Sequence, residues 1–130
     1  MSGASVAHML GDYVVQSDWM AAEKTNHNWP AAAHALSYAA CFVPLTRSLK
    51  ALAVIGGTHY LIDRYRLAQY IAWAKNQIAP AHHRYRFDQA APPTGYRPKV
   101  YGQHTLLMVA TDNAIHMAIN EYALRRWSTA

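Results

Sequence analysis

The sequence predicts an all-α protein, with one helical domain over residues 1–130 forming a four-helix bundle and a long proline-rich loop between helices three and four. Apolar residues recur at helical spacing along four segments, and no segment alternates as a β-strand does. Four of the six prolines lie between residues 78 and 102. A hydrophobic content of 52% supplies enough apolar material for one core in a chain of this length.

The first expected helix runs from Ser5 to about Lys24, and the polar residues 25–28 end it. Its apolar positions follow the helical repeat and comprise Val6, Met9, Leu10, Tyr13, Val14 and Met20. The second helix continues through Ala31 to about Leu45, because Pro30 suits a first helical turn. We expect Pro44 to bend or close that helix near its end.

The third expected helix covers Ser48 to Gln77, and the Gly56-Gly57 pair within it allows a kink or the close approach of a neighbouring backbone. Prolines and a glycine then interrupt the segment Ile78–Gly102. This predicts a loop of the length that is typical of lids and binding elements. The fourth helix, Gln103 to about Trp127, closes the bundle.

The chain carries a formal charge of +5, which suits anionic partners such as phosphate esters, nucleic acid or acidic lipid headgroups. Its one cysteine, Cys41, cannot form an internal disulfide and is expected in the core. The sequence starts without the basic and apolar regions of a secretory signal, so we expect a cytoplasmic or membrane-associated protein that is not secreted.

Two strongly apolar runs, Ala31–Leu45 and Ala51–Ile62, fall short of the ~20 residues that a helix needs to span a bilayer. Each run also contains a histidine. Buried helices of a small bundle explain these runs, and short or interface-lying membrane helices are the alternative.

Three of the five aspartates have a histidine four residues away, which gives the pairs His8/Asp12, His59/Asp63 and Asp112/His116. Random placement of eight histidines would give fewer than one such pair. On a helix this spacing puts both side chains on one face, where they can reach a common metal ion. A structural hydrogen bond is the alternative explanation for any single pair.

Histidines and aspartates are costly to bury unless they are paired, so we expect the polar stripes of the four apolar helices to meet inside the bundle. With His34 from the second helix, the expected ligands are His8, Asp12, His34, His59, Asp63, Asp112 and His116. This set exceeds the needs of one tetrahedral ion and suits two divalent ions that share a carboxylate, with zinc or manganese favoured. Three polar residues on the same helices either orient the ligands or form plain helix–helix hydrogen bonds: Gln16, Tyr38 and Asn120.

Two clustered divalent ions polarise a phosphoryl oxygen and lower the pKa of a bound water. The sequence therefore predicts a metal-dependent hydrolase of a phosphodiester or another phosphate ester, with Asp12, Asp63 and Asp112 as the catalytic carboxylates. Lys24 and Arg64 are the expected contacts to the substrate phosphate, and solvated charges at helix ends are the alternative. Nucleotide, nucleic acid and phospholipid are all compatible substrates, although no motif indicates a nucleic-acid partner.

The ordered motifs His8-Met-Leu-Gly-Asp12, His59-Tyr-Leu-Ile-Asp63 and Asp112-Asn-Ala-Ile-His116 resemble an uncharacterised family of small phage and bacterial proteins, domain of unknown function 3307. The resemblance covers nearly the whole chain. Members are commonly described as membrane proteins, so it implies a membrane surface as a partner.

A looser, motif-level similarity is to zinc-dependent phospholipase C and the single-strand nucleases of the same fold, and it implies clustered zinc. The alternative to hydrolysis is a membrane- or virion-associated helical protein, also compatible with a homo-oligomer, whose polar cluster is structural.

Overall fold

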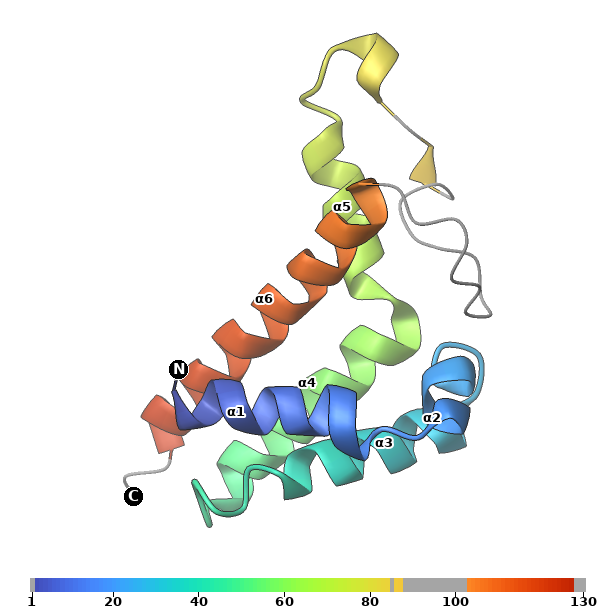
Figure 1. Ribbon diagram of the computed structural model, residues 1–130. Coiled ribbons are helices and arrows are strands. Elements are labelled where there is room, and N and C mark those ends of the chain that lie inside the picture. The colour runs from blue at the N-terminus through green and yellow to red at the C-terminus, as the bar shows by residue number, and fades with distance from the viewer. Residues whose placement is uncertain (1, 85, 88–102, 128–130) are drawn as a thin grey trace.

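The computed structural model describes residues 2–84, 86–87 and 103–127, and this part of the chain is all-helical (Figure 1). Its α-helices are α1 (Gly3–Met9), α2 (Asp18–Glu23), α3 (Asn28–Ala40), α4 (Leu49–Tyr65), α5 (Leu67–Asn76) and α6 (Gln103–Trp127). A π-helix, η1 (Leu10–Val15), follows α1, and a 3-10 turn, η2 (Ala81–His83), follows α5. Strands are absent from the described residues, so the all-α prediction is confirmed.

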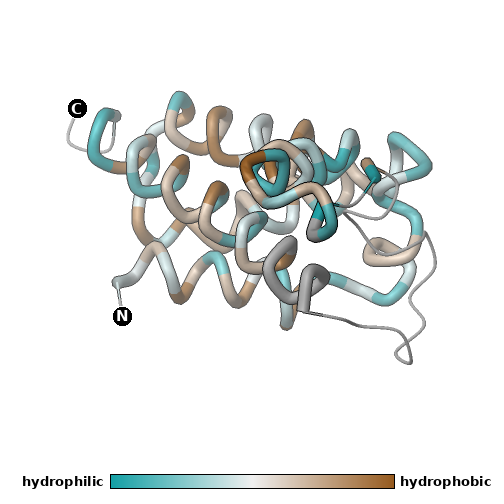
Figure 2. Tube along the Cα trace, turned by 90° about the horizontal axis from the view of Figure 1, so that it is seen from above, coloured by the Kyte–Doolittle hydropathy of each residue, from teal (hydrophilic) through white to brown (hydrophobic). Residues whose placement is uncertain are grey.

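The helices pack around α4, which contacts both α3 and α6. The chain continues from α4 into α5, and α5 also packs against α6 (Figure 1). The segment formed by α1 and η1 lies against α3 and α6, with the start of α1 and the end of α6 at the same end of the molecule (Figures 1 and 2). Residues that are far apart in the sequence therefore meet where η1, α3, α4 and α6 come together.

The core is built largely from small side chains, and its buried apolar cluster comprises Ala4, Ala7, Tyr38, Phe42, Ile55 and Ala123. Small residues let helices approach closely. A Cβ added to Gly56 on α4 would lie 3.2 Å from the Cβ of Ala39 on α3, which is tighter than an ordinary contact. This close approach brings the polar side chains of α3 and α4 within reach of one another.

The first predicted helix, Ser5–Lys24, was wrong as a single element. The chain passes from α1 into η1 and leaves the helical conformation at Gln16, whose ψ is 119°. Ser17 then starts α2, because its hydroxyl accepts a hydrogen bond from the Met20 amide at 3.3 Å. The apolar spacing runs through this break and does not reveal it.

The third predicted helix, Ser48–Gln77, is likewise two helices. Arg66 separates α4 from α5 and has φ 51° and ψ 49°, in the left-handed region. This conformation costs a residue with a Cβ roughly 1–2 kcal/mol. Figure 1 shows the chain changing direction there.

The second predicted helix ends at Ala40 rather than near Leu45. Pro44 has no amide hydrogen to donate to the Ala40 carbonyl, so the helix cannot continue through it. The amides of Phe42 and Val43 instead bond to carbonyls three residues back, at 3.0 and 3.2 Å.

The fourth helix has the bounds that the sequence predicted. Most of the predicted proline-rich loop, residues 88–102, lies outside the described residues. Within the described part of the chain, every helix is too short or too polar to cross a bilayer.

Candidate metal centre

Four donor atoms from three helical elements converge in the interior. Asp12 lies on η1, His34 on α3, and His59 and Asp63 on α4. His34 Nε2 lies 2.8 Å from His59 Nε2, and each of these nitrogens lies 3.1–3.4 Å from Asp12 Oδ1 and Asp63 Oδ2. A tetrahedral zinc ion with bonds of about 2.0–2.1 Å holds its ligands about 3.3 Å apart. These five distances are close to that spacing.

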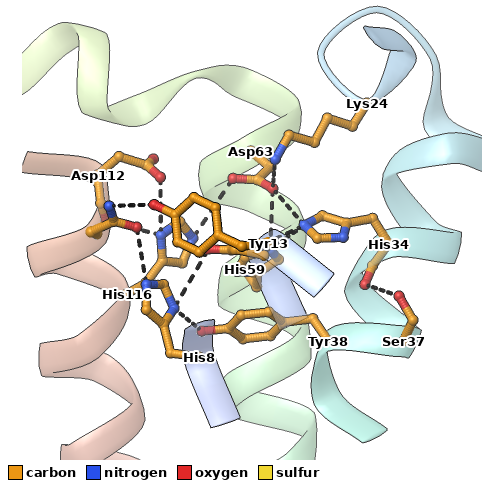
Figure 3. Close-up of polar contacts among 12 residues, drawn as sticks. His8, Tyr13, Lys24, His34, Ser37, Tyr38, His59, Asp63, Asp112 and His116 are labelled. Atoms are coloured by element: carbon orange, nitrogen blue, oxygen red, sulfur yellow. Dashed lines mark hydrogen bonds and ion pairs between the residues drawn. The ribbon is translucent and has the colours of Figure 1, made fainter. Parts of the chain in front are cut away.

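A second group of donors adjoins the first and shares Asp63 with it. It consists of Asp63, Asp112 and His116, whose ligand atoms lie within 4.8 Å of one another. His116 Nδ1 bonds to the Asp112 carbonyl at 2.9 Å, so in the neutral ring Nδ1 carries the proton and Nε2 is free to act as a ligand. That Nε2 lies 3.8 Å from Asp63 Oδ1, while Oδ2 of the same carboxylate faces His34 and His59 (Figure 3). Asp63 thus has one oxygen toward each group.

Two of these potential ligand atoms are buried without a hydrogen-bond partner among the described residues: Asp12 Oδ1 and His116 Nε2. A buried polar atom without a partner is costly, and native proteins rarely leave one without a reason such as a bound ion. Nδ1 of His34 and of His59 is also unpartnered within the described chain. These nitrogens carry the ring protons whenever Nε2 binds a cation.

Lys24 brings a positive charge to the shared carboxylate. Its Nζ donates to Asp63 Oδ2 at 2.8 Å (Figure 3). Burial acts to raise the pKa of Asp63, but Lys24, His59 and His34 together hold it well below the usual range. Burial acts to lower the pKa of Lys24, but the attraction of Asp63 outweighs burial and raises it. Both groups are therefore ionised near neutral pH.

The pKa values of the three candidate histidine ligands, His34, His59 and His116, shift in different directions. Burial lowers the pKa of His59. Burial acts in the same direction on His34, but the nearby carboxylates of Asp12 and Asp63 outweigh it and raise the pKa above its ordinary value. At His116 the pKa is also raised, because the bond to Asp112 outweighs burial. Any cation that binds His34 or His116 must therefore displace a proton that these rings hold more tightly than usual.

His8 belongs to a hydrogen-bond chain beside this cluster. Asn120 Nδ2 donates to the Tyr38 hydroxyl at 2.6 Å, so Tyr38 donates to His8 Nδ1 at 2.7 Å. His8 Nε2 carries the proton and donates to Asn113 Oδ1 at 3.0 Å. Asn113 in turn donates to the Tyr13 hydroxyl at 2.8 Å. Both ring nitrogens of His8 are therefore engaged by neighbours.

The structure brings together six of the seven predicted ligands: Asp12, His34, His59, Asp63, Asp112 and His116. His8, the seventh, lies 3.5 Å from Asp12 Oδ2, but its Nδ1 accepts from Tyr38. Because its Nδ1 lone pair accepts this hydrogen bond, His8 neither joins the donor set nor donates to Asp12.

The residues predicted to orient the ligands lie around the cluster. The Tyr38 ring stacks on His59 at a centroid distance of 3.6 Å and an angle of 13°. Asn120 reaches the ligands only through Tyr38. The side-chain amide of Gln16 uses both of its polar atoms: its nitrogen donates to the Asp12 backbone carbonyl, and its oxygen accepts from Lys24 Nζ at 3.3 Å.

A cavity of about 250 Å³ opens beside the cluster. All three predicted catalytic carboxylates, Asp12, Asp63 and Asp112, are among its lining residues, as is Lys24. Arg64, the other predicted phosphate contact, points elsewhere: its Nε donates to Asn28 Oδ1 at 2.9 Å and its Nη1 to the Thr25 carbonyl at 2.7 Å.

The arginine that lines the cavity is Arg66. The sequence predicted Arg64 for this place instead, because it does not reveal the left-handed turn at Arg66 that decides which side chain faces the cavity. Asn113 and Tyr13 also line the cavity, and the sequence did not predict either as a site residue. Neither is part of a histidine–aspartate pair, so the spacing that revealed the other residues carries no signal for them.

Comparison with known proteins places the chain in a family but gives it no activity. Residues 5–92 match the family described as Protein of unknown function (DUF3307). Neither curated proteins nor solved structures gave a match. The matched segment contains all four residues of the first donor group, Asp12, His34, His59 and Asp63, together with Lys24. Because the match spans more than half of the sequence, the chain belongs to the DUF3307 family.

Proposed function

We propose that this protein is a metal-dependent hydrolase of a phosphate ester, with a dinuclear histidine–aspartate centre. The observation that carries the proposal is the position of Asp63, which has one carboxylate oxygen in each of two adjoining donor groups. A shared carboxylate between two ions 3.5–4 Å apart, roughly, is the usual plan of dinuclear hydrolytic sites.

The donors can be assigned to two ions. His34, His59, Asp12 and Asp63 would hold the first ion, and Asp63, Asp112 and His116 would hold the second. Mixed nitrogen and oxygen donors suit zinc or manganese. Bound divalent ions supply Lewis acidity toward a phosphoryl oxygen and a lowered pKa for water.

The side chains of this protein would do the rest. His8 would be held beside Asp12 by Tyr38 and Asn113, as the tautomer protonated at Nε2. Lys24 offsets the charge of Asp63. Because Lys24 also lines the cavity, its ammonium can attract the phosphate of a substrate that lies there.

Access from the cavity favours catalysis over a purely structural ion. Structural zinc sites are usually closed, with every position filled by protein, whereas catalytic sites keep an open position. Here Asp12, Asp63 and Asp112 all line a cavity that opens to solvent. The second donor group contains only three residues, Asp63, Asp112 and His116, which leaves coordination positions for water or substrate.

Elemental analysis and phosphatase assays with 4-nitrophenyl phosphate and bis(4-nitrophenyl) phosphate test the proposal. We expect bound zinc or manganese, and hydrolysis that stops on chelation and returns on reloading. Asp63→Asn should lose most of the bound metal and more than 100-fold in kcat/KM, because it removes a ligand from both groups. His27→Ala, an exposed histidine that pairs with Glu23, is the matched control and should change neither. A protein that keeps its metal in Asp63→Asn, or that binds metal and cleaves neither ester, would contradict the proposal.

A non-catalytic role in association is the second candidate, and one observation favours it. The segment formed by α1 and η1 exposes an apolar stripe: Val6, Met9, Leu10, Val14 and Val15. Exposed apolar patches of this kind mark interaction surfaces. Under this candidate the stripe lies on a membrane surface and the polar cluster serves stability alone. Co-sedimentation with acidic lipid vesicles, together with no hydrolysis by the metal-loaded protein, would support it.

A further inference from the structure

The cavity beside the cluster is lined by both charged and apolar side chains. Its volume of about 250 Å³ is below the roughly 300–1,000 Å³ of sites that hold drug-sized ligands, so it suits a small molecule. Its charged lining residues include the cations Lys24 and Arg66 beside the three carboxylates of the cluster. The apolar part of the wall is formed by Tyr13, Ile62 and Val109, from η1, α4 and α6.

Arg66 is held at the cavity by an unusual backbone conformation. It is the only residue in the described chain, glycines aside, with a positive φ. Such conformations persist where the surrounding structure enforces them, and they cluster at binding sites. Burial also lowers the pKa of its guanidinium, which indicates that the charged group is partly withdrawn from solvent.

The start of α5 adds backbone hydrogen-bond donors to the lining of the cavity. Arg66 is the N-cap residue of α5, and no side chain in the described residues caps that end. The first amide groups of a helix have no partner within the helix and favour an anion. Ala68 and Gln69, in the first turn of α5, line the cavity with Arg66, and of these two the Gln69 amide already donates to the Arg66 carbonyl at 3.0 Å. Lys24 supplies a second cation nearby.

We propose that this cavity binds a small phosphorylated molecule that carries an apolar group, with Arg66 and the start of α5 contacting the phosphate and Tyr13, Ile62 and Val109 contacting the apolar group. This inference rests on the proposed function, because it names the substrate class of the same site. The volume of about 250 Å³, the two cations and the apolar lining residues favour a small ester over a polymeric nucleic acid or a membrane lipid.

Phenylphosphonate is a suitable probe because its carbon–phosphorus bond resists hydrolysis. Isothermal titration of the purified protein, with and without added zinc, should show phenylphosphonate binding at least 10-fold tighter than inorganic phosphate. Arg66→Ala should weaken both ligands by about 10- to 100-fold, the range expected for charge-assisted hydrogen bonds. Arg125→Ala, an exposed arginine that pairs only with Glu121 among the described contacts, is the matched control and should bind as the unaltered protein does.

Val109→Ala tests the apolar side separately. Val109 is partly exposed on α6, so shortening it should leave the fold intact. We expect phenylphosphonate to bind about threefold to fivefold more weakly and phosphate to bind equally well. If Arg66→Ala does not fold, Arg66→Lys, which keeps the charge without the planar fork, and Val109→Ala carry the test.

Binding and hydrolysis give separate outcomes. Binding through Arg66 without cleavage of 4-nitrophenyl phosphate would support this site and contradict the proposed catalysis. Cleavage with an unchanged KM in Arg66→Ala would do the reverse. Equal affinity for phenylphosphonate and phosphate would overturn the assignment of the apolar wall.

Discussion

Gly11 shows how one missing methyl group permits the geometry of the cluster. A Cβ at this position would lie 2.4 Å from Cδ2 of Tyr38, whose ring stacks on His59. Gly11→Ala should therefore lower the free energy of unfolding by about 1–3 kcal/mol. It should also weaken metal binding, because Asp12 is the next residue. Circular dichroism on heating and a zinc titration measure the two effects.

Gly57 is the matched control for that substitution. A Cβ there would meet no described atom within 4 Å. Since alanine is better than glycine in a helix interior by about 1 kcal/mol, Gly57→Ala should stabilise the protein. Equal effects of the two substitutions would show that the space beside Tyr38 is not limiting.

The histidine–aspartate spacing predicted which side chains gather, and it worked where both partners lie on one helix. His59 with Asp63 and Asp112 with His116 are such pairs, because four residues form about one helical turn. The arrangement around His8 and Arg66 was beyond this signal. His8 is diverted by Tyr38 from another helix, and the position of Arg66 depends on a backbone conformation that its residue type disfavours.

The junction between α4 and α5 sets where the cavity lies, and its conformation has a measurable cost. Replacing Arg66 with glycine or with alanine removes the same side chain, but only glycine adopts φ 51° without strain. We expect Arg66→Gly to be about 1 kcal/mol more stable than Arg66→Ala by urea denaturation.

Ala53→Gly, at an exposed position inside α4, should behave oppositely and cost about 1 kcal/mol relative to the unaltered protein. An Arg66→Gly variant less stable than Arg66→Ala would mean that this residue is helical in solution. Both Arg66 variants should lose affinity for phenylphosphonate to the same extent.

Helix breaks were the part of the fold that the sequence pattern did not predict. The apolar repeat continues through Gln16 and through Arg66, so it carries no sign of either break. The serine that caps α2, Ser17, was a local signal that the repeat obscured. The helix ends that were predicted well, such as those of α6, are the ones flanked by proline-rich or terminal segments.

The molecule buries its ionisable groups beside a core of small apolar residues, so their state should affect the stability of the whole fold. Asp12, Asp63 and four histidines lie in the interior, where charge is costly unless it is paired. A ligand that binds only the folded state adds stability, about 2.7 kcal/mol at 100 times its dissociation constant. We expect zinc to raise the melting temperature by several degrees relative to EDTA.

That increase should depend on pH in a direction set by His34 and His116. Their pKa values are raised in the folded protein, so without metal they contribute stability that is complete below about pH 6.5 and is lost as the pH rises through the folded pKa. Zinc needs both rings unprotonated, so protons compete with it at low pH. The difference in melting temperature between zinc and EDTA should therefore grow from pH 6 to pH 8. The apparent affinity of the protein for zinc should rise by up to about 10-fold per pH unit for each proton displaced.

Differential scanning fluorimetry at pH 6, 7 and 8 measures this dependence, and calorimetry in buffers of different ionisation enthalpy counts the protons released. His27→Ala should reproduce the behaviour of the unaltered protein, since that imidazole lies at the surface with Glu23. His116→Gln should release about one proton fewer. A zinc effect that is the same at all three pH values would mean that neither His34 nor His116 is a ligand, because a neutral donor set binds zinc without displacing protons in this range.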